Sequence, residues 1–266
     1  MQKKEKKTFI HNGIRVGYHK LGSGPPLLIL HGWGSQSSIM MPLAEKLSDI
    51  RTCFVPDLPG FGDSASPDVS WSVDDYVDFA EAFSTRNMEA PIDVLAHSFG
   101  ARMVLKWCVR DNAQDKLRHV LITGGAGMKP RRTFHYYRKR IIATILKAPL
   151  FLLPENTRQR AMSWLRNTRL WRSLGSADYR ELDGVMRETF VKTVSENLEP
   201  CLPKIKHEIL LLWGKDDEAT PWYQAERMEQ GLEKAALVGI DNAGHYAFLD
   251  QPAAFEKIAR AYFQQK

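Results

Sequence analysis

Short apolar runs, separated by turns and amphipathic segments, occupy two parts of this chain. A wholly apolar run such as Leu27–Leu30 fits a strand covered on both faces of a sheet, whereas apolar residues at helical spacing, as in Ser72–Phe83, predict a helix. The predicted strands are Thr8–His11, Ile14–His19, Leu27–Leu30, Thr52–Val55, Ile92–Leu95, His119–Ile122, Glu208–Trp213 and Ala236–Ile240. The predicted helices are Ser38–Leu47, Ser72–Phe83, Ala101–Val109, one after Pro221 and one from Pro252. The first two strands form a hairpin, because Asn12-Gly13 supplies the positive φ angles of a tight turn.

The alternation of strands and helices stops at 125–203, a segment with no convincing strand. Apolar residues recur at helical spacing within it, at Phe134, Tyr137, Ile141 and Ile145. Strands that alternate with helices predict an α/β domain with a parallel sheet. We therefore predict a mostly parallel eight-stranded sheet with helices on both faces, built from residues 1–124 and 204–266. The segment 125–203 is predicted to be a helical insertion after the sixth strand.

A serine between small residues joins the strand Ile92–Leu95 to the helix that follows, in the sequence AHSFG centred on Ser98. A strand that turns sharply into a helix holds its turn residue in strained backbone geometry and lifts the side chain out of the sheet. Strand and helix then approach so closely that large side chains at Ala96 or Gly100 would collide. Ser98 also lies at a helix N-terminus, where unpaired N–H groups favour nearby negative charge. That arrangement suits an acyl-transfer nucleophile.

This strand, turn and helix resemble the nucleophile elbow of the α/β-hydrolase superfamily, written Gly-x-Ser-x-Gly, with Ala96 in place of the first glycine. Taken alone, the motif fits a turn serine that caps a helix equally well. Three further segments match the family in the expected order, and the resemblance covers residues 8–124 and 204–266. It implies the α/β-hydrolase fold, with 125–203 as a helical lid.

A serine hydroxyl becomes a nucleophile when a base lies within hydrogen-bond reach and a third group orients that base. The segment Gly214–Pro221, after a predicted strand, looks like the acid loop of the family. This likeness implies Asp217 as the acid of a catalytic triad, with Asp216 as its rival. The segment NAGHYAF, before the terminal helix, is similar to the catalytic-histidine segment and implies His245 as the base.

Two backbone N–H groups are implied to stabilise the oxyanion that forms on attack. One belongs to Phe99, directly after the nucleophile, and the other to Trp33, in the loop HGWG. In the family, the histidine at the position of His31 shapes this loop, and a loop like Asp57–Ser64, DLPGFGDS, braces the site. We interpret the histidines without such context as surface or structural residues: His11, His19, His119, His135 and His207.

Composition limits the setting of the protein. Cys53, Cys108 and Cys201 are widely spaced and form no metal motif, so each is expected to pack as a small apolar residue. The N-terminal sequence MQKKEKKTFI has no apolar run behind it, so we do not expect it to be a secretory signal. The apolar stretches are too short or too interrupted to span a bilayer. We predict a cytoplasmic protein whose chemistry uses neither a metal nor a cofactor.

The net charge of +6 is unevenly distributed. Twelve Lys and Arg and a single acid lie between Lys129 and Arg172, so this segment carries +11 and the rest of the chain −5. A basic, aromatic, amphipathic helix fits an anionic membrane surface or selects acidic and lipid-like substrates. The alternative is that these charges are the outer faces of lid helices. No nucleic-acid-binding fold is present, so no nucleic-acid partner is expected.

The nucleophile narrows the function. Haloalkane dehalogenases and epoxide hydrolases of this fold carry aspartate at the elbow, and Ser98 argues against both. The loop HGWGSQ resembles that of small bacterial carboxylesterases. We therefore predict hydrolysis of a carboxylic ester through an acyl-enzyme. The alternatives on the same triad are cleavage of a thioester, an amide or a carbon–carbon bond β to a ketone. A binding protein that keeps the fold without turnover is the alternative from another class.

Overall fold

The computed structural model describes residues 5–131, 154, 157, 161 and 184–265. The chain divides into two compact units, one made of Met1–Lys129 and Glu188–Lys266 and the other of Pro130–Arg187. The predicted apolar stripe from Phe134 to Ile145 lies outside the described residues, and so do most of the twelve basic residues between Lys129 and Arg172. The architecture that follows is that of the first unit.

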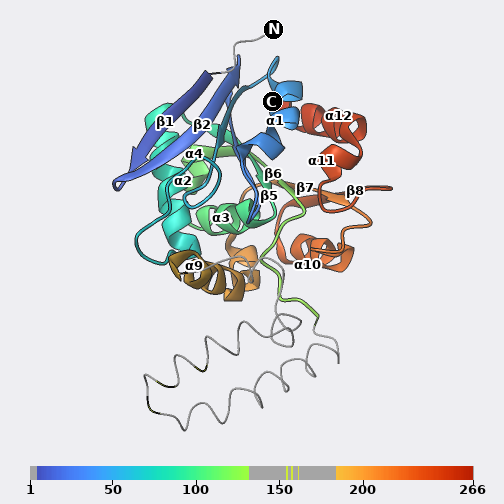
Figure 1. The fold of residues 1–266 in the computed structure, drawn as a ribbon. Coiled ribbons are helices and arrows are strands. Elements are labelled where there is room, and N and C mark those ends of the chain that lie inside the picture. Colours follow the sequence, from blue (N-terminus) through green and yellow to red (C-terminus); the bar gives the residue numbers. More distant parts are fainter. Residues whose placement is uncertain (1–4, 132–153, 155–156, 158–160, 162–183, 266) are drawn as a thin grey trace. The chain divides into compact units, whose positions relative to one another are not determined.

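One eight-stranded sheet forms the centre of this unit, with the strand order β1-β2-β4-β3-β5-β6-β7-β8 (Figure 1). The strands are β1 (Glu5–His11), β2 (Ile14–Gly22), β3 (Pro26–Leu30), β4 (Thr52–Pro56), β5 (Ile92–His97), β6 (Leu117–Thr123), β7 (Ile209–Gly214) and β8 (Ala235–Ile240). Strand β2 pairs antiparallel with β1 and β4, and all other neighbours are parallel. The predicted mostly parallel eight-stranded sheet is confirmed.

The predicted hairpin is confirmed at Asn12-Gly13, where φ is 48° and 82°. Its strands are longer than their apolar residues indicate, since β1 begins at Glu5 and β2 ends at Gly22. The reason is that the ends of these strands are set by ladder partners. Glu5 pairs with Lys20, and Gly22 pairs with Thr52 of β4.

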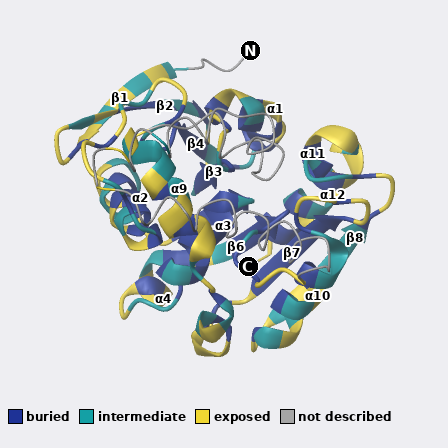
Figure 2. Ribbon diagram, turned by 60° about the horizontal axis from the view of Figure 1, so that its bottom comes forward, coloured by how far each residue is buried: buried dark blue, intermediate teal, exposed yellow. Residues whose placement is uncertain are grey.

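Helices cover both faces of the sheet, as predicted (Figure 1). One face carries α1 (Ser37–Leu47), α11 (Ala247–Asp250) and α12 (Pro252–Phe263). The other carries α2 (Val73–Asn87), α3 (Phe99–Trp107) and α10 (Trp222–Gly231). The chain also forms α4 (Ala113–Lys116), α9 (Gly184–Ser195) and the 3-10 helix η2 (Glu199–Lys204). Buried residues follow the central strands and the inner sides of these helices, and exposed ones follow the outer sides (Figure 2).

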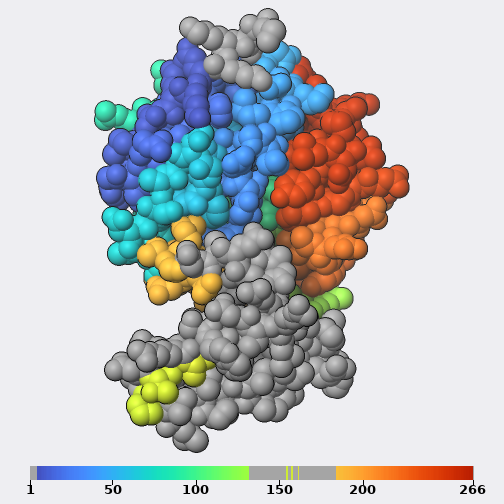
Figure 3. Space-filling model, in the orientation of Figure 1, coloured from blue at the N-terminus to red at the C-terminus, as the bar shows by residue number. Residues whose placement is uncertain are grey.

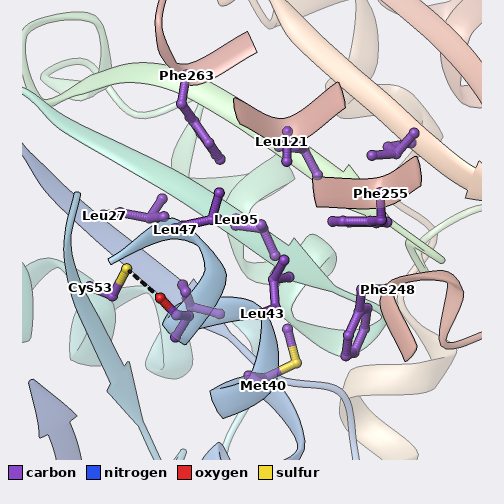
Figure 4. Close-up of a cluster of buried hydrophobic side chains, with 14 of the residues drawn as sticks. Leu27, Met40, Leu43, Leu47, Cys53, Leu95, Leu121, Phe248, Phe255 and Phe263 are labelled. Atoms are coloured by element: carbon purple, nitrogen blue, oxygen red, sulfur yellow. Dashed lines mark hydrogen bonds between the residues drawn. The ribbon is translucent and has the colours of Figure 1, made fainter. Parts of the chain in front are cut away.

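A cluster of buried apolar side chains joins the sheet to α1, α11 and α12. Leu27 and Leu95 extend from β3 and β5 toward α1, and Leu121 of β6 lies beside Phe255 of the C-terminal helix (Figure 4). Phe248 of α11 belongs to the same cluster. Each fully buried side chain of this size contributes about 1.5–3 kcal/mol. Helix α1 is thereby packed against the C-terminal helix α12, and the two lie side by side on the surface (Figure 3).

Candidate active site

Ser98 stands between β5 and α3 with φ 51° and ψ −107°, a backbone conformation that non-glycine residues rarely adopt. Its surroundings hold it there, because its N–H donates to the carbonyl of Thr123 at 3.1 Å and its carbonyl accepts from the N–H of Ala126 at 3.0 Å. From Ile92 to Gly100, Ser98 is the one residue that is not buried. The turn therefore presents a serine side chain at the end of a buried strand.

The small residues around Ser98 have a steric explanation. A Cβ atom at Gly100 would lie 2.8 Å from Leu30 Cβ and 2.9 Å from the Leu30 carbonyl oxygen. A Cβ atom at Gly32 would lie 3.1 Å from Ser98 Cβ. Helix α3 thus lies closer to the end of β3 than a Cβ atom at Gly100 allows, and the loop after β3 lies so close to Ser98 that a Cβ atom at Gly32 would be crowded.

An acid and a histidine meet beside this turn. Asp217 follows β7, His245 follows β8, and His245 Nδ1 lies 2.8 Å from Asp217 Oδ2. The Asp217 carboxylate is buried, whereas Asp216 is exposed. His245 packs against the residue before the serine, with 4.7 Å between the ring centroids of His97 and His245. The three residues expected to form a triad therefore belong to one neighbourhood.

Within the described residues, the hydroxyl of Ser98 makes no hydrogen bond to His245. Catalytic hydrogen bonds are often long before substrate binds and tighten in the complex, so the missing bond does not argue against proton transfer from Ser98 to His245.

The Asp217 carboxylate lies in a ring of donors. Oδ1 accepts from the N–H groups of Ala219 and Thr220, both at 2.8 Å, and Oδ2 accepts from Thr220 Oγ1 at 2.8 Å in addition to His245. Burial raises the pKa of Asp217, but the hydrogen bond and charge of His245 and the bonds from Thr220 outweigh it, so the pKa lies below its ordinary value. Asp217 is consequently ionised at neutral pH and able to orient the imidazole.

The two residues named for the oxyanion hole lie on either side of the turn. Phe99 is the first residue of α3, so its N–H has no acceptor within the helix. Trp33 lies in the loop after β3, where Gly34 has φ 67° and Ser35 N–H donates to the Gly32 carbonyl at 3.2 Å. The ring of Trp33 is 5.2 Å from the ring of Phe99, so the two residues pack directly together.

His31 holds this loop in place. Its Nε2 accepts from the N–H of Leu58 at 2.9 Å, and its Nδ1 bonds to the carbonyl of Gly32 at 2.7 Å. Burial lowers the pKa of His31 to about 4, so the ring is neutral. The brace extends through Asp57, whose carboxylate accepts from the N–H groups of Ser37 and Asp63. The loop 57–64 therefore supports the loop that carries Trp33, and Phe61 packs directly on the Trp33 ring at 4.9 Å between centroids.

Two residues at the site were not predicted from the sequence. Thr220 donates to Asp217, and His97 bonds through Nε2 to the carbonyl of His245 at 3.1 Å. The position of Thr220, three residues after an acid in a loop, is a local signal for such a bond. The contact of His97 joins residues 148 positions apart and has no signal in the sequence pattern.

Other chemistry-bearing side chains lie elsewhere. Among the described residues, no group of three or more His, Cys, Asp and Glu is arranged to hold a metal ion. Cys53 and Cys108 are buried, and burial raises the pKa of both thiols, that of Cys53 to about 12. Within the same residues, no helix is long and apolar enough to cross a membrane.

The chain is similar to known hydrolases in sequence and in structure. The model of the Alpha/beta hydrolase family matches residues 27–258. A 2-hydroxymuconate semialdehyde hydrolase of Pseudomonas sp. (strain CF600) is 23% identical over 95% of this chain and 91% of its own length. A pimeloyl-[acyl-carrier protein] methyl ester esterase of Nitrosomonas europaea is 24% identical over 88% of this chain and 94% of its own. The crystal structure of a mutant meta-cleavage product hydrolase, CumD, superposes with a TM-score of 0.72 at 17% identity, covering 98% of both chains.

Proposed function

Because the chain belongs to the alpha/beta hydrolase family, we propose that it is a serine hydrolase that cleaves carboxylic esters. In this proposal Ser98 is the nucleophile, His245 the base and Asp217 the acid. The observation that supports it most is the 2.8 Å contact between Asp217 and His245, next to a serine in strained backbone geometry at a helix N-terminus.

The bond to Asp217 defines the state of the base. A carboxylate only accepts, so the proton of neutral His245 lies on Nδ1, and Nε2 is left as an acceptor. As Ser98 Oγ attacks the carbonyl carbon of the ester, its proton passes to Nε2, and Asp217 stabilises the imidazolium that results. The N–H groups of Trp33 and Phe99 donate to the oxyanion, each contributing about two to three orders of magnitude in rate.

Collapse of the tetrahedral intermediate expels the alcohol, which takes the proton from His245. Water then attacks the acyl-enzyme, with the same histidine as base, and frees Ser98. Every catalytic group that these reaction steps require is a side chain or a backbone amide of the chain itself.

Cleavage of a carbon–carbon bond β to a ketone is the second candidate function. It is favoured by the similarity to the semialdehyde hydrolase, just as the similarity to the methyl ester esterase favours ester cleavage. Thioesters and amides are further substrates for the same triad. A binding protein without turnover has the same fold but leaves Ser98 unreactive.

A substrate screen tests these alternatives. Initial rates are measured on p-nitrophenyl esters of increasing chain length, on a thioester, on an amide and on a β-diketone, with Ser98→Ala as the control. Ester turnover that exceeds the others and disappears in Ser98→Ala is the expected result. Faster turnover of the β-diketone would replace ester cleavage by carbon–carbon cleavage. Absence of turnover on all of them would favour the binding protein.

We further propose that 125–203 is a lid that selects the substrate, and that its charge favours acidic or lipid-like acyl groups. The charge of +11 between Lys129 and Arg172 supports this proposal and, as its extension, contact with an anionic membrane surface. Co-sedimentation with anionic liposomes at low and high salt tests the membrane contact. The expected result is binding at low salt that is lost at high salt, and a failure to bind at low salt removes the membrane from the proposal.

A further inference from the structure

We propose that His97 is a positioning residue for the reaction, which holds the backbone of His245 and thereby the reach of its imidazole toward Ser98. The inference rests on the proposed function, since it assigns a role in the same site. His97 is the last residue of β5 and is 1% exposed, so it lies in the interior below the site rather than in contact with substrate.

The first part of the argument is the contact with the base. His97 Nε2 lies 3.1 Å from the carbonyl oxygen of His245. A carbonyl oxygen only accepts, so Nε2 carries the proton and donates it. Because the bond is made to the main chain, it fixes the point from which the side chain of His245 extends.

The ring of His97 also packs against the segment that carries the base. Its centroid lies 4.8 Å from that of Tyr246, at an interplanar angle of 33°, and 5.4 Å from that of Phe248, at 82°. With the ring of His245 itself at 4.7 Å, three aromatic neighbours from residues 245–248 surround one histidine. The hydrogen bond and the packing therefore restrain the same four-residue segment.

On its other side His97 meets the loop after β3. A Cβ atom at Gly32 would lie 3.0 Å from His97 Nδ1 and 3.3 Å from its Cε1. Nδ1 is buried and makes no hydrogen bond within the described residues, as expected of the unprotonated nitrogen of a ring that donates through Nε2. His97 thus fills the space between the loop of Trp33 and the segment of His245, and sets the spacing between the proposed oxyanion donor and the base.

The charge of His97 fits this role. Burial, and then the neighbouring His245, lower the pKa of His97 to about 3, so its ring is neutral when the site operates near pH 7. A neutral ring leaves His245 free to take up the proton of Ser98, whereas a cation 4.7 Å away would oppose the imidazolium.

The chain contains a matched control. His207 is also buried, at 5% exposed, and its Nε2 lies 3.2 Å from the carbonyl oxygen of Ala113, away from the site. Removing either histidine breaks a bond from Nε2 to a main-chain carbonyl in a buried environment, and removing His207 also breaks the 3.1 Å contact of its Nδ1 with Gln114 Nε2. A role that is only structural predicts the same consequences for both.

The test compares His97→Leu, which removes the donor, with His97→Gln, whose amide reaches the position of Nε2, and with His207→Leu. We expect His97→Leu to lower kcat about 10- to 100-fold with KM within about threefold of wild type, since small misplacement of a catalytic group is costly. His97→Gln is expected to recover most of the loss. His207→Leu is expected to lose stability but to keep kcat. If His97→Leu does not fold, His97→Asn, which is too short to reach the carbonyl, takes its place.

A measurement without substrate separates this inference from the proposed function. The proton between His245 Nδ1 and Asp217 is observable as a low-field ¹H NMR resonance, which we expect to shift or broaden in His97→Leu and to be retained in His97→Gln and His207→Leu. An unchanged resonance and kcat in His97→Leu, or an equal loss of kcat in His207→Leu, overturns the role of His97. A wild type that turns over no substrate but shows the resonance and its loss in His97→Leu overturns the proposed function alone.

Discussion

The Asp217 carboxylate accepts hydrogen bonds from four donors, of which one belongs to His245 and the others to Ala219 and Thr220. The likeness of Gly214–Pro221 to the family's acid loop, which counts residues from Gly214, favoured Asp217 over Asp216. Its other partners were not predicted. They depend on how the loop folds back on itself, which neither periodicity nor spacing describes.

Replacing the two neighbouring acids separates their roles. The amide of Asp217→Asn has one oxygen that accepts and one nitrogen that donates, so it can hold His245 in the wrong tautomer. We therefore expect kcat to fall by about 10³- to 10⁴-fold. Asp216→Asn removes an exposed carboxylate, and kcat should stay within about twofold. Steady-state kinetics on a responsive ester distinguish them, and a larger loss in Asp216→Asn would reassign the acid.

Among the described histidines whose pKa burial lowers, His31 and His97 have the large shifts, and these two make stability depend on pH most strongly. The pKa of His31 is about 4 and that of His97 about 3 in the folded chain, because both are buried, against about 6.5 when unfolded. The unfolded state therefore binds more protons between these values, and stability falls as the pH falls below 6.5. Between pH 7 and pH 5 each histidine is expected to cost about 2 kcal/mol of unfolding free energy.

Urea unfolding at pH 7 and pH 5 measures this dependence. In His97→Gln one of the two groups no longer titrates, so the loss of stability between the two pH values should be about 2 kcal/mol smaller than in wild type. An identical loss in the variant would show that His97 does not titrate below its unfolded pKa.

At the level of elements, α3 is tied to α9 by one buried side chain. The guanidinium of Arg102 donates to the carbonyls of Thr193 and Glu196 at 2.8 Å and of Val194 at 3.3 Å. These carbonyls lie at the C-terminal end of α9, where no intrahelical donor is available. Phe190 of the same helix packs on Trp33, with 5.2 Å between ring centroids, so α9 contacts both α3 and the loop after β3.

Removing this tie should destabilise the fold more than removing ion pairs from the surface. Arg102→Met leaves three carbonyls without a donor and is expected to cost about 2–4 kcal/mol. Arg110→Met removes ion pairs of a partly exposed arginine with Asp78 and Glu81, and is expected to cost less than about 1 kcal/mol. Chemical denaturation of both variants measures the two losses of stability. A larger loss in Arg110→Met than in Arg102→Met would contradict this prediction.

Elements were predictable where burial dictates side-chain type. The apolar runs at β3 and β7 predict those strands to within one or two residues, because a strand covered on both faces needs apolar residues throughout. The extensions of β1 and β2 were missed, since backbone pairing places charged residues such as Glu5 and Lys20 in a ladder.

Across the whole molecule, the proposed site lies at one edge of the sheet. Trp33, Ser98, Asp217 and His245 follow β3, β5, β7 and β8, whose carboxyl ends share that edge because the strands are parallel. That these four residues come together is predictable from the sequence, because each of them follows a predicted strand. The strand order itself, with β3 between β4 and β5, is a property of long-range packing that local patterns do not carry.

The opposite edge carries a buried charge cluster that serves stability. Asp93, near the start of β5, accepts from Arg51 Nε at 2.6 Å and from Arg118 Nε at 2.9 Å. Burial raises the pKa of Asp93, but the two arginines outweigh it and hold the pKa below its ordinary value.

Asp93→Asn removes the negative charge that pairs with the buried Arg51 and with Arg118, and is expected to cost about 3–5 kcal/mol of stability. Because the cluster lies far along β5 from Ser98, the kcat of the folded fraction should stay within about twofold. Thermal unfolding and kinetics at a temperature where the variant is folded test this separation. A stability equal to wild type, or a collapse of kcat in folded protein, contradicts it.

The reactivity of Ser98 is measured most directly by labelling with a fluorophosphonate and locating the adduct by peptide mass spectrometry. We predict one equivalent of label on Ser98 of the wild type, none in Ser98→Ala, and labelling slowed by orders of magnitude in His245→Ala. A folded wild type that remains unlabelled, or label that persists in Ser98→Ala, would contradict the assignment of Ser98 as the nucleophile.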